Sequence, residues 1–148
     1  MHKILFVCHG NICRSTMAQC VMTHLVNQAG RSWEFMIDSA ATSREEIGNP
    51  PHHGTVKQLK KMHIAVIPHK ARQIQSSEYD TWDYIIGMDA QNMSNLQRIF
   101  GGDPDGKIYS LLSFAGEFRP IADPWYTGDF ETTYTDVLLG CKALLETL

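Results

Sequence analysis

The sequence predicts an α/β fold in which a single domain, residues 1–148, is built on a parallel sheet with helices on both faces. Three observations support this prediction. Short apolar runs alternate along the chain with segments whose apolar residues recur every three or four positions. The first apolar run passes through a turn of glycine and asparagine directly into such a helical segment. The length of 148 residues, with 43% hydrophobic residues, provides one full core and leaves no room for a second.

Residues 4–15 are the stretch around which the rest of the chain is arranged. Residues 4–7 are apolar without polar alternation, which predicts a strand buried on both faces. From Ser15 onward the apolar residues recur at helical spacing, and Gly30 stands where a helix C-cap is expected. The turn between strand and helix therefore lies at a helix N-terminus, where free backbone N–H groups and the helix dipole favour an anion.

The remaining elements follow in order along the chain. Further strands are predicted at residues 33–39, 82–88 and 107–111, from their bulky apolar residues. Helices are predicted around residues 56–62, at 90–100 after an Asp89 N-cap, and at 130–148 after Asp129, with a helical turn at 76–78. Residues 40–54 are expected to form a surface loop near the strand ends, and residues 112–124 an irregular stretch, while no element is assigned to residues 64–74.

The turn after the first strand carries residue types suited to phosphate chemistry. The helix terminus that attracts an anion also favours the thiolate form of Cys8, and the thiolate is the nucleophilic form. Arg14 can hold two phosphate oxygens with its planar guanidinium, and Ser15 can donate its hydroxyl proton to the sulfur. Gly10 and Asn11 accept left-handed backbone angles, which a loop needs if its N–H groups are to converge on one centre. An ordinary buried thiol at the strand end is the weaker interpretation.

A second motif, Asp123-Pro124 followed by Trp125-Tyr126, can supply the proton donor that a phosphate leaving group needs. If the loop holding Asp123 lies over the same sheet edge as Cys8, that carboxyl group reaches the leaving oxygen. The two aromatic residues are then placed to wall a flat, ring-bearing substrate. A simple Asp-Pro turn remains the alternative when the dipeptide is taken alone.

Composition limits the classes of partner. The net charge of -3 and the pI near 6.1 argue against a nucleic-acid surface, so attraction for a phosphorylated substrate must be local to the loop. No apolar stretch is long enough for a signal peptide or a membrane span, which predicts a cytoplasmic protein. The four cysteines are expected to be thiols. A zinc site at Cys8, His9 and Cys13 is disfavoured because the chain has no second cysteine pair, and no metal or cofactor is expected.

The chain resembles the low-molecular-weight protein tyrosine phosphatases. Residues 7–15, VCHGNICRS, match the family's signature, and residues 123–126, DPWY, match its acid loop. Residues 38–42, 47–51, 71–74 and 88–89 also look like family segments, so the resemblance spans nearly the whole chain. It implies a four-stranded parallel sheet and metal-free hydrolysis of phosphotyrosine, in proteins, peptides or small aryl phosphates. It also implies a phosphate-binding loop between the first strand and the first helix, made of Cys8, His9, Gly10, Asn11, Ile12, Cys13, Arg14 and Ser15.

The resemblance also implies individual roles. Cys8 would be the nucleophile that becomes a phosphocysteine, Arg14 the phosphate ligand, and Ser15 a support for the thiolate. Asp123 would protonate the leaving phenolate and then take a proton from the attacking water.

A further implied task is bracing of the loop. Asn11 would hold it through hydrogen bonds to Ser39 and His69, which match family positions with that supporting task.

Two positions in this chain affect the expected substrate. Where the family commonly places an aromatic residue beside the substrate ring, this chain has Arg44, Glu45 and Glu46, so Glu45 stands in for one wall of the site and Trp125 and Tyr126 form the other. The branch of the family that hydrolyses phosphoarginine carries threonine at the position of Ile12, and Ile12 therefore favours phosphotyrosine.

Cysteines and histidines elsewhere suggest other hypotheses. Because Cys13 shares a loop with Cys8, it is a candidate redox partner that captures an oxidised Cys8 as a disulfide. His52 and His53 are adjacent in a loop, and we expect them to point apart into solvent rather than to bind metal.

Three other functions compete with the phosphatase interpretation. Arsenate reductases share the fold and the loop but need a further cysteine pair, and the chain has no cysteine between Cys20 and Cys141. A phosphocysteine carrier domain of a sugar phosphotransferase system has no need of Arg14 and Asp123 together. A non-catalytic phosphotyrosine-binding module would be expected to lack Cys8 or Asp123.

Overall fold

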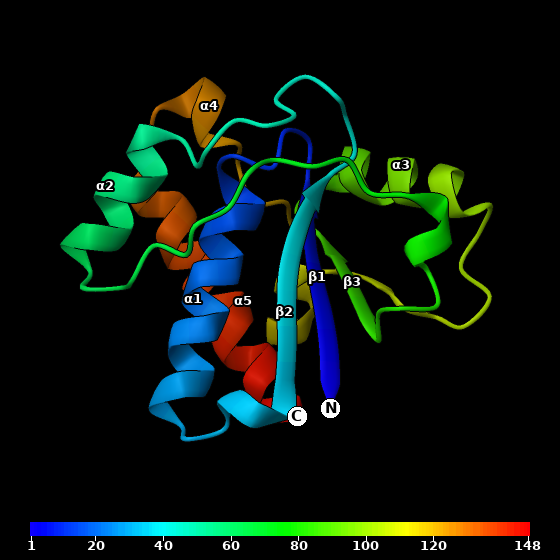
Figure 1. Cartoon of the computed structure of the whole chain (residues 1–148), viewed down its shortest axis with the longest axis horizontal. Coiled ribbons are helices and arrows are strands. Elements are labelled where there is room, and N and C mark those ends of the chain that lie inside the picture. Colours follow the sequence, from blue (N-terminus) through cyan, green and yellow to red (C-terminus); the bar gives the residue numbers. More distant parts are fainter.

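The computed structural model describes residues 1–148 and contains one parallel sheet of four strands in the order β2-β1-β3-β4. The strands are β1 His2–Cys8, β2 Phe35–Ala41, β3 Tyr84–Gly87 and β4 Ile108–Ser110. β1 lies inside the sheet between β2 and β3, so the residue that ends it is placed at the centre of the sheet edge (Figure 1). The fold predicted from the sequence is confirmed.

Helices cover both faces of this sheet. They are α1 Arg14–Gln28, α2 His53–Lys61, α3 Ala90–Phe100, α4 Pro124–Thr127 and α5 Phe130–Thr147, with short 3-10 turns η1 Ser32–Glu34, η2 Ser76–Glu78 and η3 Leu111–Ala115. Figure 1 shows α1 and α5 side by side on one face and α3 on the other, with α2 packed outside α1 and α5. The two termini lie at the end of the sheet away from α4 (Figure 1).

Strand β1 contributes to a separate core on each side of the sheet. Ile4 and Phe6 point into the core beneath α1 and α5, whereas Leu5 and Val7 point into the core beneath α3. All four are fully buried. Because side chains alternate across a strand, a strand covered on both faces has no position for a polar residue, and this explains the unbroken apolar run.

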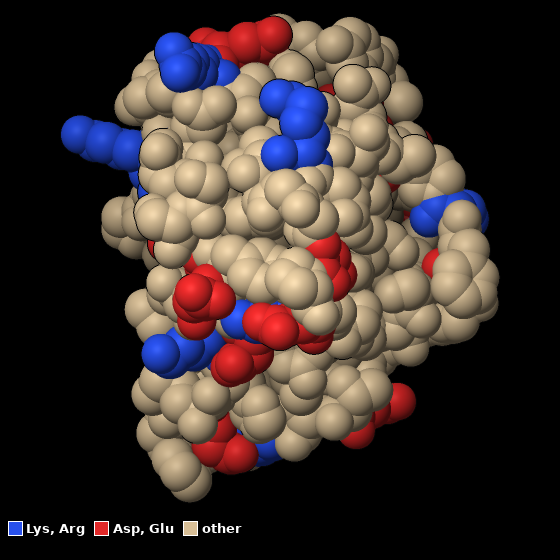
Figure 2. Space-filling view, turned by 90° about the vertical axis from the view of Figure 1, so that its right-hand side faces the viewer, with Lys and Arg blue, Asp and Glu red and all other residues tan.

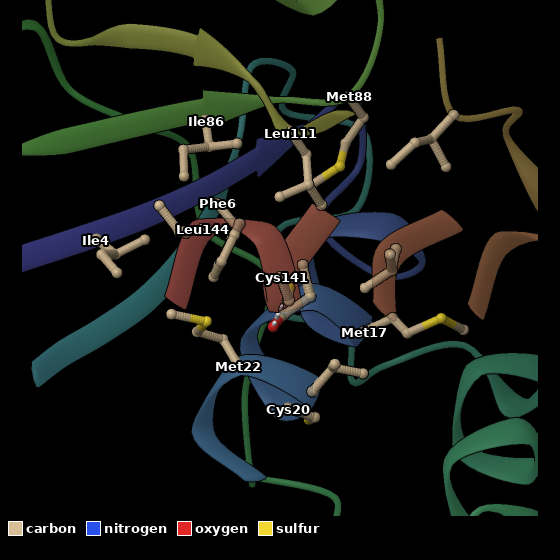
Figure 3. Packing of buried hydrophobic residues seen from close by; sticks show 14 of the residues in the cluster. Ile4, Phe6, Met17, Cys20, Met22, Ile86, Met88, Leu111, Cys141 and Leu144 are labelled. Carbon is tan, nitrogen blue, oxygen red and sulfur yellow. Dashed lines mark hydrogen bonds between the residues drawn. The ribbon is translucent and has the colours of Figure 1, made fainter. Parts of the chain in front are cut away.

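The larger core fills the space between the sheet and the pair α1 and α5. Figure 3 shows the side chains that meet there, among them Ile4, Phe6, Met17, Cys20, Met22, Ile86, Met88, Leu111, Cys141 and Leu144. Gly140 of α5 allows this close approach, because a Cβ at that position would lie 2.5 Å from Leu111 Cγ. The packing fixes α1 against the sheet, and α1 in turn fixes the loop that follows β1.

Several predicted boundaries were wrong by a few residues. The second strand begins at Phe35 and continues to Ala41, because Trp33 lies in η1 with 76% of its surface exposed. The third strand is shorter at both ends than residues 82–88, and residue 111 begins η3 instead of ending the fourth strand. Gly30 follows the C-cap of α1 with φ of 68°, as its position in the sequence predicted.

The acid segment was predicted as an irregular loop, and this was wrong in detail. Pro124–Thr127 forms the short helix α4, which begins with a proline and has Asp123 as its N-cap. The carboxylate of Asp123 accepts a hydrogen bond from Trp125 N–H at 3.0 Å. Proline is well suited to the first position of a helix, since that N–H has no partner within the helix in any case.

The surface carries no broad field of one charge on the face that Figure 2 shows, where acidic and basic side chains lie in small groups separated by uncharged surface. None of the helices is both long enough and apolar enough to cross a bilayer.

Candidate active site

Cys8 is the last residue of β1, and its sulfur lies beneath the turn that leads into α1. The backbone N–H of Asn11 donates to Cys8 Sγ at 3.3 Å, and Ser15 Oγ lies 3.0 Å from the same sulfur. Asn11 has φ of 59°, the left-handed conformation expected for it, which turns this N–H inward. One backbone N–H and one hydroxyl therefore face the thiol where the chain enters α1, an environment that favours the thiolate.

Asn11 holds the loop through both ends of its amide. Its Nδ2 donates to Ser15 Oγ at 2.8 Å and to Ser39 Oγ at 3.0 Å. Its Oδ1 lies 2.7 Å from His69 Nε2 and accepts from Arg72 N–H at 3.2 Å. The structure thus brings together the Asn11, Ser39 and His69 side chains that the family resemblance implied as supports.

Hydrogen-bond directions within this network fix the roles of its members. Ser15 Oγ accepts from Asn11, so its own proton is free to point at Cys8 Sγ. Since Asn11 Oδ1 can only accept, His69 carries its proton on Nε2. Burial lowers the pKa of His69, with a smaller opposing effect from Asp38, so the neutral ring is favoured.

Arg14 lies at the first position of α1 with only 3% of its side chain exposed. Its Nη1 donates to Asp89 Oδ2 at 2.7 Å and to the carbonyl of Ile121 at 2.9 Å, and its Nη2 lies 3.4 Å from Asp123 Oδ2. Burial opposes the charged form, but Cys8, Asp89 and Asp123 together raise the pKa of Arg14 above its usual value. The guanidinium is therefore held rigidly beside the thiol as a permanent cation.

The structure places Asp123 within reach of the same pocket. One carboxylate oxygen caps α4 through Trp125 N–H, and the other faces Arg14. About a quarter of its side chain, 23%, remains exposed, so this carboxyl group is open to a bound molecule. The segments that hold Cys8 and Asp123 are far apart in the sequence and meet where the parallel strands end (Figure 1).

A pocket opens directly above Cys8. It is lined by Cys8, His9, Gly10, Ile12, Cys13, Arg14, Glu45, Glu46, Asp123, Trp125 and Tyr126. The three side chains predicted as substrate walls, Glu45, Trp125 and Tyr126, all line it. Glu45 Oε2 lies 3.0 Å from His9 Nε2, and Trp125 and Tyr126 are 56% and 83% exposed. Asn11 and Ser15 belong to the same loop but are fully buried, and they support it without lining the pocket.

Cys13 lies in the same loop but in a different environment. It packs with Ile12 and Ala71 and is 4% exposed. Burial, together with Cys8 and Asp123, raises the pKa of the Cys13 thiol to about 12. Cys13 is therefore a protonated thiol at neutral pH and a poor nucleophile. No group of three or more His, Cys, Asp or Glu side chains is arranged to hold a metal ion.

Sequence reasoning missed several contributors to the site. Asp89 was predicted only as a helix N-cap, a role that it does fill by accepting from Asn92 N–H, but its other oxygen anchors Arg14. Arg72 was not singled out, although its N–H braces Asn11 and its guanidinium pairs with Asp38 at 3.2 Å. No local pattern marks such residues, because their partners lie far away in the sequence.

The expectation that the rings of His52 and His53 point apart was wrong. Their rings do not point apart but stack with centroids 4.2 Å apart. His52 is the N-cap of α2, and its ring also stacks on Phe130. Helix α2 starts at His53, which brings the two rings onto one side of the chain instead of alternating them as in an extended loop.

Comparisons with known proteins agree with this geometry. The family model described as low molecular weight phosphotyrosine protein phosphatase matches residues 3–148. The low molecular weight protein-tyrosine-phosphatase YfkJ of Bacillus subtilis is 37% identical over 150 residues, covering 100% of this chain and 96% of that protein. Its crystal structure aligns with a TM-score of 0.96 at 38% identity, covering 99% and 94% of the two chains.

Two further matches are a human and a streptococcal protein. The human low molecular weight phosphotyrosine protein phosphatase is 39% identical over 151 residues, covering 97% of this chain and 94% of that protein. The crystal structure of SP-PTP, from Streptococcus pyogenes, aligns with a TM-score of 0.90 at 44% identity, covering 100% and 93% of the chains. The family model and these relatives match nearly the whole chain, including the cysteine, arginine and aspartate of the pocket. The protein therefore belongs to the low molecular weight phosphotyrosine protein phosphatase family.

Proposed function

We propose that this protein hydrolyses phosphotyrosine through a phosphocysteine intermediate on Cys8. The observation that carries the proposal is the environment of the Cys8 sulfur, which receives the Asn11 N–H and faces the Ser15 hydroxyl beside the Arg14 guanidinium. Donors that point at the sulfur stabilise the thiolate as nucleophile. The same groups stabilise the phosphate that binds above it.

In the first step the Cys8 thiolate attacks phosphorus, and the bond from phosphorus to the tyrosine oxygen breaks. Arg14 holds two of the three non-bridging oxygens while the remaining backbone N–H groups of the loop surround the third. The protonated carboxyl of Asp123 gives its proton to the departing phenolate, which leaves as neutral tyrosine. Asp123 fits this role because its carboxylate opens into the pocket beside Arg14.

In the second step water attacks the phosphocysteine. Asp123, now a carboxylate, takes a proton from that water, and the bond between phosphorus and sulfur breaks to release inorganic phosphate and the Cys8 thiolate. Ser15 stabilises the sulfur as it regains its negative charge, because its hydroxyl proton is free to point at it. The protein ends the cycle in the form in which it began.

The walls of the pocket support aromatic substrates. Trp125 and Tyr126 are exposed and line the pocket, and a phosphotyrosine ring that projects outward from Cys8 passes between them and Glu45. Glu45 and Glu46 at the mouth support a roughly few-fold preference for basic residues beside the phosphotyrosine, which weakens as salt is raised. The four free cysteines support a reducing compartment such as the cytoplasm.

The proposal is tested by assaying hydrolysis of phosphotyrosine, phosphoserine and phosphoarginine peptides in the presence of a chelator. We expect phosphotyrosine to be strongly preferred and the chelator to have no effect. The Cys8→Ser variant should fold and bind phosphate without turnover, while Cys20→Ser, which alters a buried cysteine of α1 outside the pocket, should keep its activity. Preference for phosphoarginine, or full activity in Cys8→Ser, would contradict the proposal.

A further inference from the structure

His52 lies between the phosphate loop and the aromatic wall of the pocket. Its backbone N–H donates to the carbonyl of Ile12 at 2.8 Å, which ties it to the phosphate loop. Its ring meets Trp125 edge-on, with centroids 5.6 Å apart and an interplanar angle of 79°. The ring also stacks on Phe130 at 5.1 Å and 15°. One residue therefore bridges three segments, because its ring contacts α4 and the start of α5 while its backbone is bonded to the loop that holds Cys8.

The hydrogen bonds of His52 define its tautomer. Gly54 N–H donates to His52 Nδ1 at 3.0 Å, so Nδ1 carries a lone pair and the proton of the neutral ring lies on Nε2. This bond caps α2, a task that serine, threonine, aspartate or asparagine usually performs. A histidine at this position adds a ring that none of those residues offers, and the ring is what reaches Trp125.

We propose that His52 is a positioning residue for substrate recognition, which as a neutral ring holds Trp125 at a fixed place beside the phosphate loop and so sets the affinity for the substrate's aromatic group. The inference rests on the proposed phosphatase function and specifies how that site recognises its substrate. Trp125 needs such a support because it is 56% exposed and belongs to a helix of only four residues. Packing of Trp125 against the fixed His52 ring restricts its conformation before the substrate binds, so less conformational entropy is lost on binding.

The support depends on the protonation state of His52. Burial and the neighbouring His53 lower the pKa of His52 below its ordinary value of 6.5, and Glu46 opposes this shift. The phosphate loop contributes only a backbone carbonyl to its surroundings, while α4 and α5 contribute the uncharged rings of Trp125 and Phe130. Protonation of His52 Nδ1 would place its N–H against the Gly54 N–H, and the hydrogen bond that caps α2 would be lost.

The sign of the pH effect follows from this shift. Because the folded structure favours the neutral ring, the stabilisation of the stack is complete above pH 6.5 and is lost as pH falls below that value. We therefore expect acid to weaken substrate binding through this contact as well as through titration of the substrate.

Two substitutions separate the ring from the cap. His52→Asn keeps an N-cap acceptor but removes the ring, and we expect it to raise the KM for a small aryl phosphate about two- to tenfold while kcat changes less than about twofold. His52→Phe keeps a ring that can stack but has no Nδ1, and we expect its KM at neutral pH to stay close to that of the wild type. His53→Asn is the matched control, since His53 stacks on His52 but has no ring contact with Trp125.

The pH dependence provides a second readout. The KM of the wild type is measured from pH 5 to 8 and divided by the KM of His52→Phe at the same pH, so that titration of the substrate cancels. This ratio should rise below about pH 6.5, and Trp125 fluorescence emission should change over the same range. The Trp125→Phe variant identifies that emission among the three tryptophans.

The possible outcomes are distinct. Equal KM values for His52→Asn and His53→Asn, with a flat wild-type ratio, would overturn the assignment of His52 while leaving the phosphatase function intact. Failure of the wild type to hydrolyse any phosphotyrosine substrate would instead contradict the proposed function. A normal KM for His52→Asn, with loss of thermal stability in His52→Phe alone, would show that His52 is only a helix cap and would also overturn the inference.

Discussion

Replacement of Asn11 is the sharpest test of how the phosphate loop is held. The side chain is fully buried and makes four hydrogen bonds, two from its Nδ2 and two to its Oδ1. Asn11→Ala leaves Arg72 N–H without an acceptor and His69 Nε2 with only its longer contact to Ser39 Oγ at 3.3 Å, which costs about 1 to 3 kcal/mol for each donor. Holding alanine at φ of 59° costs about 1 kcal/mol more.

The expected loss for Asn11→Ala is therefore about 3 to 7 kcal/mol, a large part of the roughly 5 to 15 kcal/mol of a typical domain. Urea unfolding measures it directly, and the melting temperature should fall by about 6 °C or more. Asn11→Gly relieves the backbone strain and should be less damaging by up to about 1 kcal/mol. Asn27→Ala, on the exposed end of α1, should change stability by less than about 0.5 kcal/mol. A loss below about 1 kcal/mol for Asn11→Ala would refute the reasoning.

Three further predictions concern the chemistry. Asp123→Ala should slow hydrolysis of aryl phosphates with poor leaving groups by roughly 10²-fold or more and of good ones less, and equal losses across a leaving-group series would remove Asp123 from the acid role. Peroxide should inactivate the wild type reversibly and Cys13→Ser much less reversibly, because Cys13 can form a disulfide with the oxidised Cys8. The high pKa of Cys13 makes this disulfide form slowly. Equal recovery of activity by added thiols in both proteins would leave Cys13 a packing residue. Glu45→Tyr should lower the KM for small aryl phosphates about two- to tenfold by adding a stacking surface opposite Trp125, and unchanged kinetics would show that this side chain points away from the substrate.

Local sequence patterns were enough to predict the main elements of the fold. The unbroken apolar run of residues 4–7 in β1 and the helical spacing of apolar residues in α1 are local features, so a short window of sequence reveals them. The boundaries at Trp33 and in residues 82–88 were wrong because they depend on contacts with distant segments. Trp82, for example, is buried in the core beneath α3 although it lies outside β3.

The residues of the loop around Cys8 were predictable because their chemistry is concentrated in one short stretch. Asp89 was recognised only in its local role as a cap, since its second role appears when β3 is placed beside β1 and Arg14 reaches across. The stack of His52 on Phe130 has the same origin, because it joins residues that are distant in the sequence. Tertiary contacts of this kind leave no periodic signal in a single sequence.

Detection of the phosphocysteine intermediate tests the central claim most directly. The protein is mixed with a phosphotyrosine peptide, quenched during turnover with denaturant and analysed by mass spectrometry of its peptides. The account predicts a phosphate group on the peptide that contains Cys8, formed as tyrosine is released and absent in Cys8→Ser. Phosphate attached to any other residue, or full turnover without phosphate on Cys8, would contradict it.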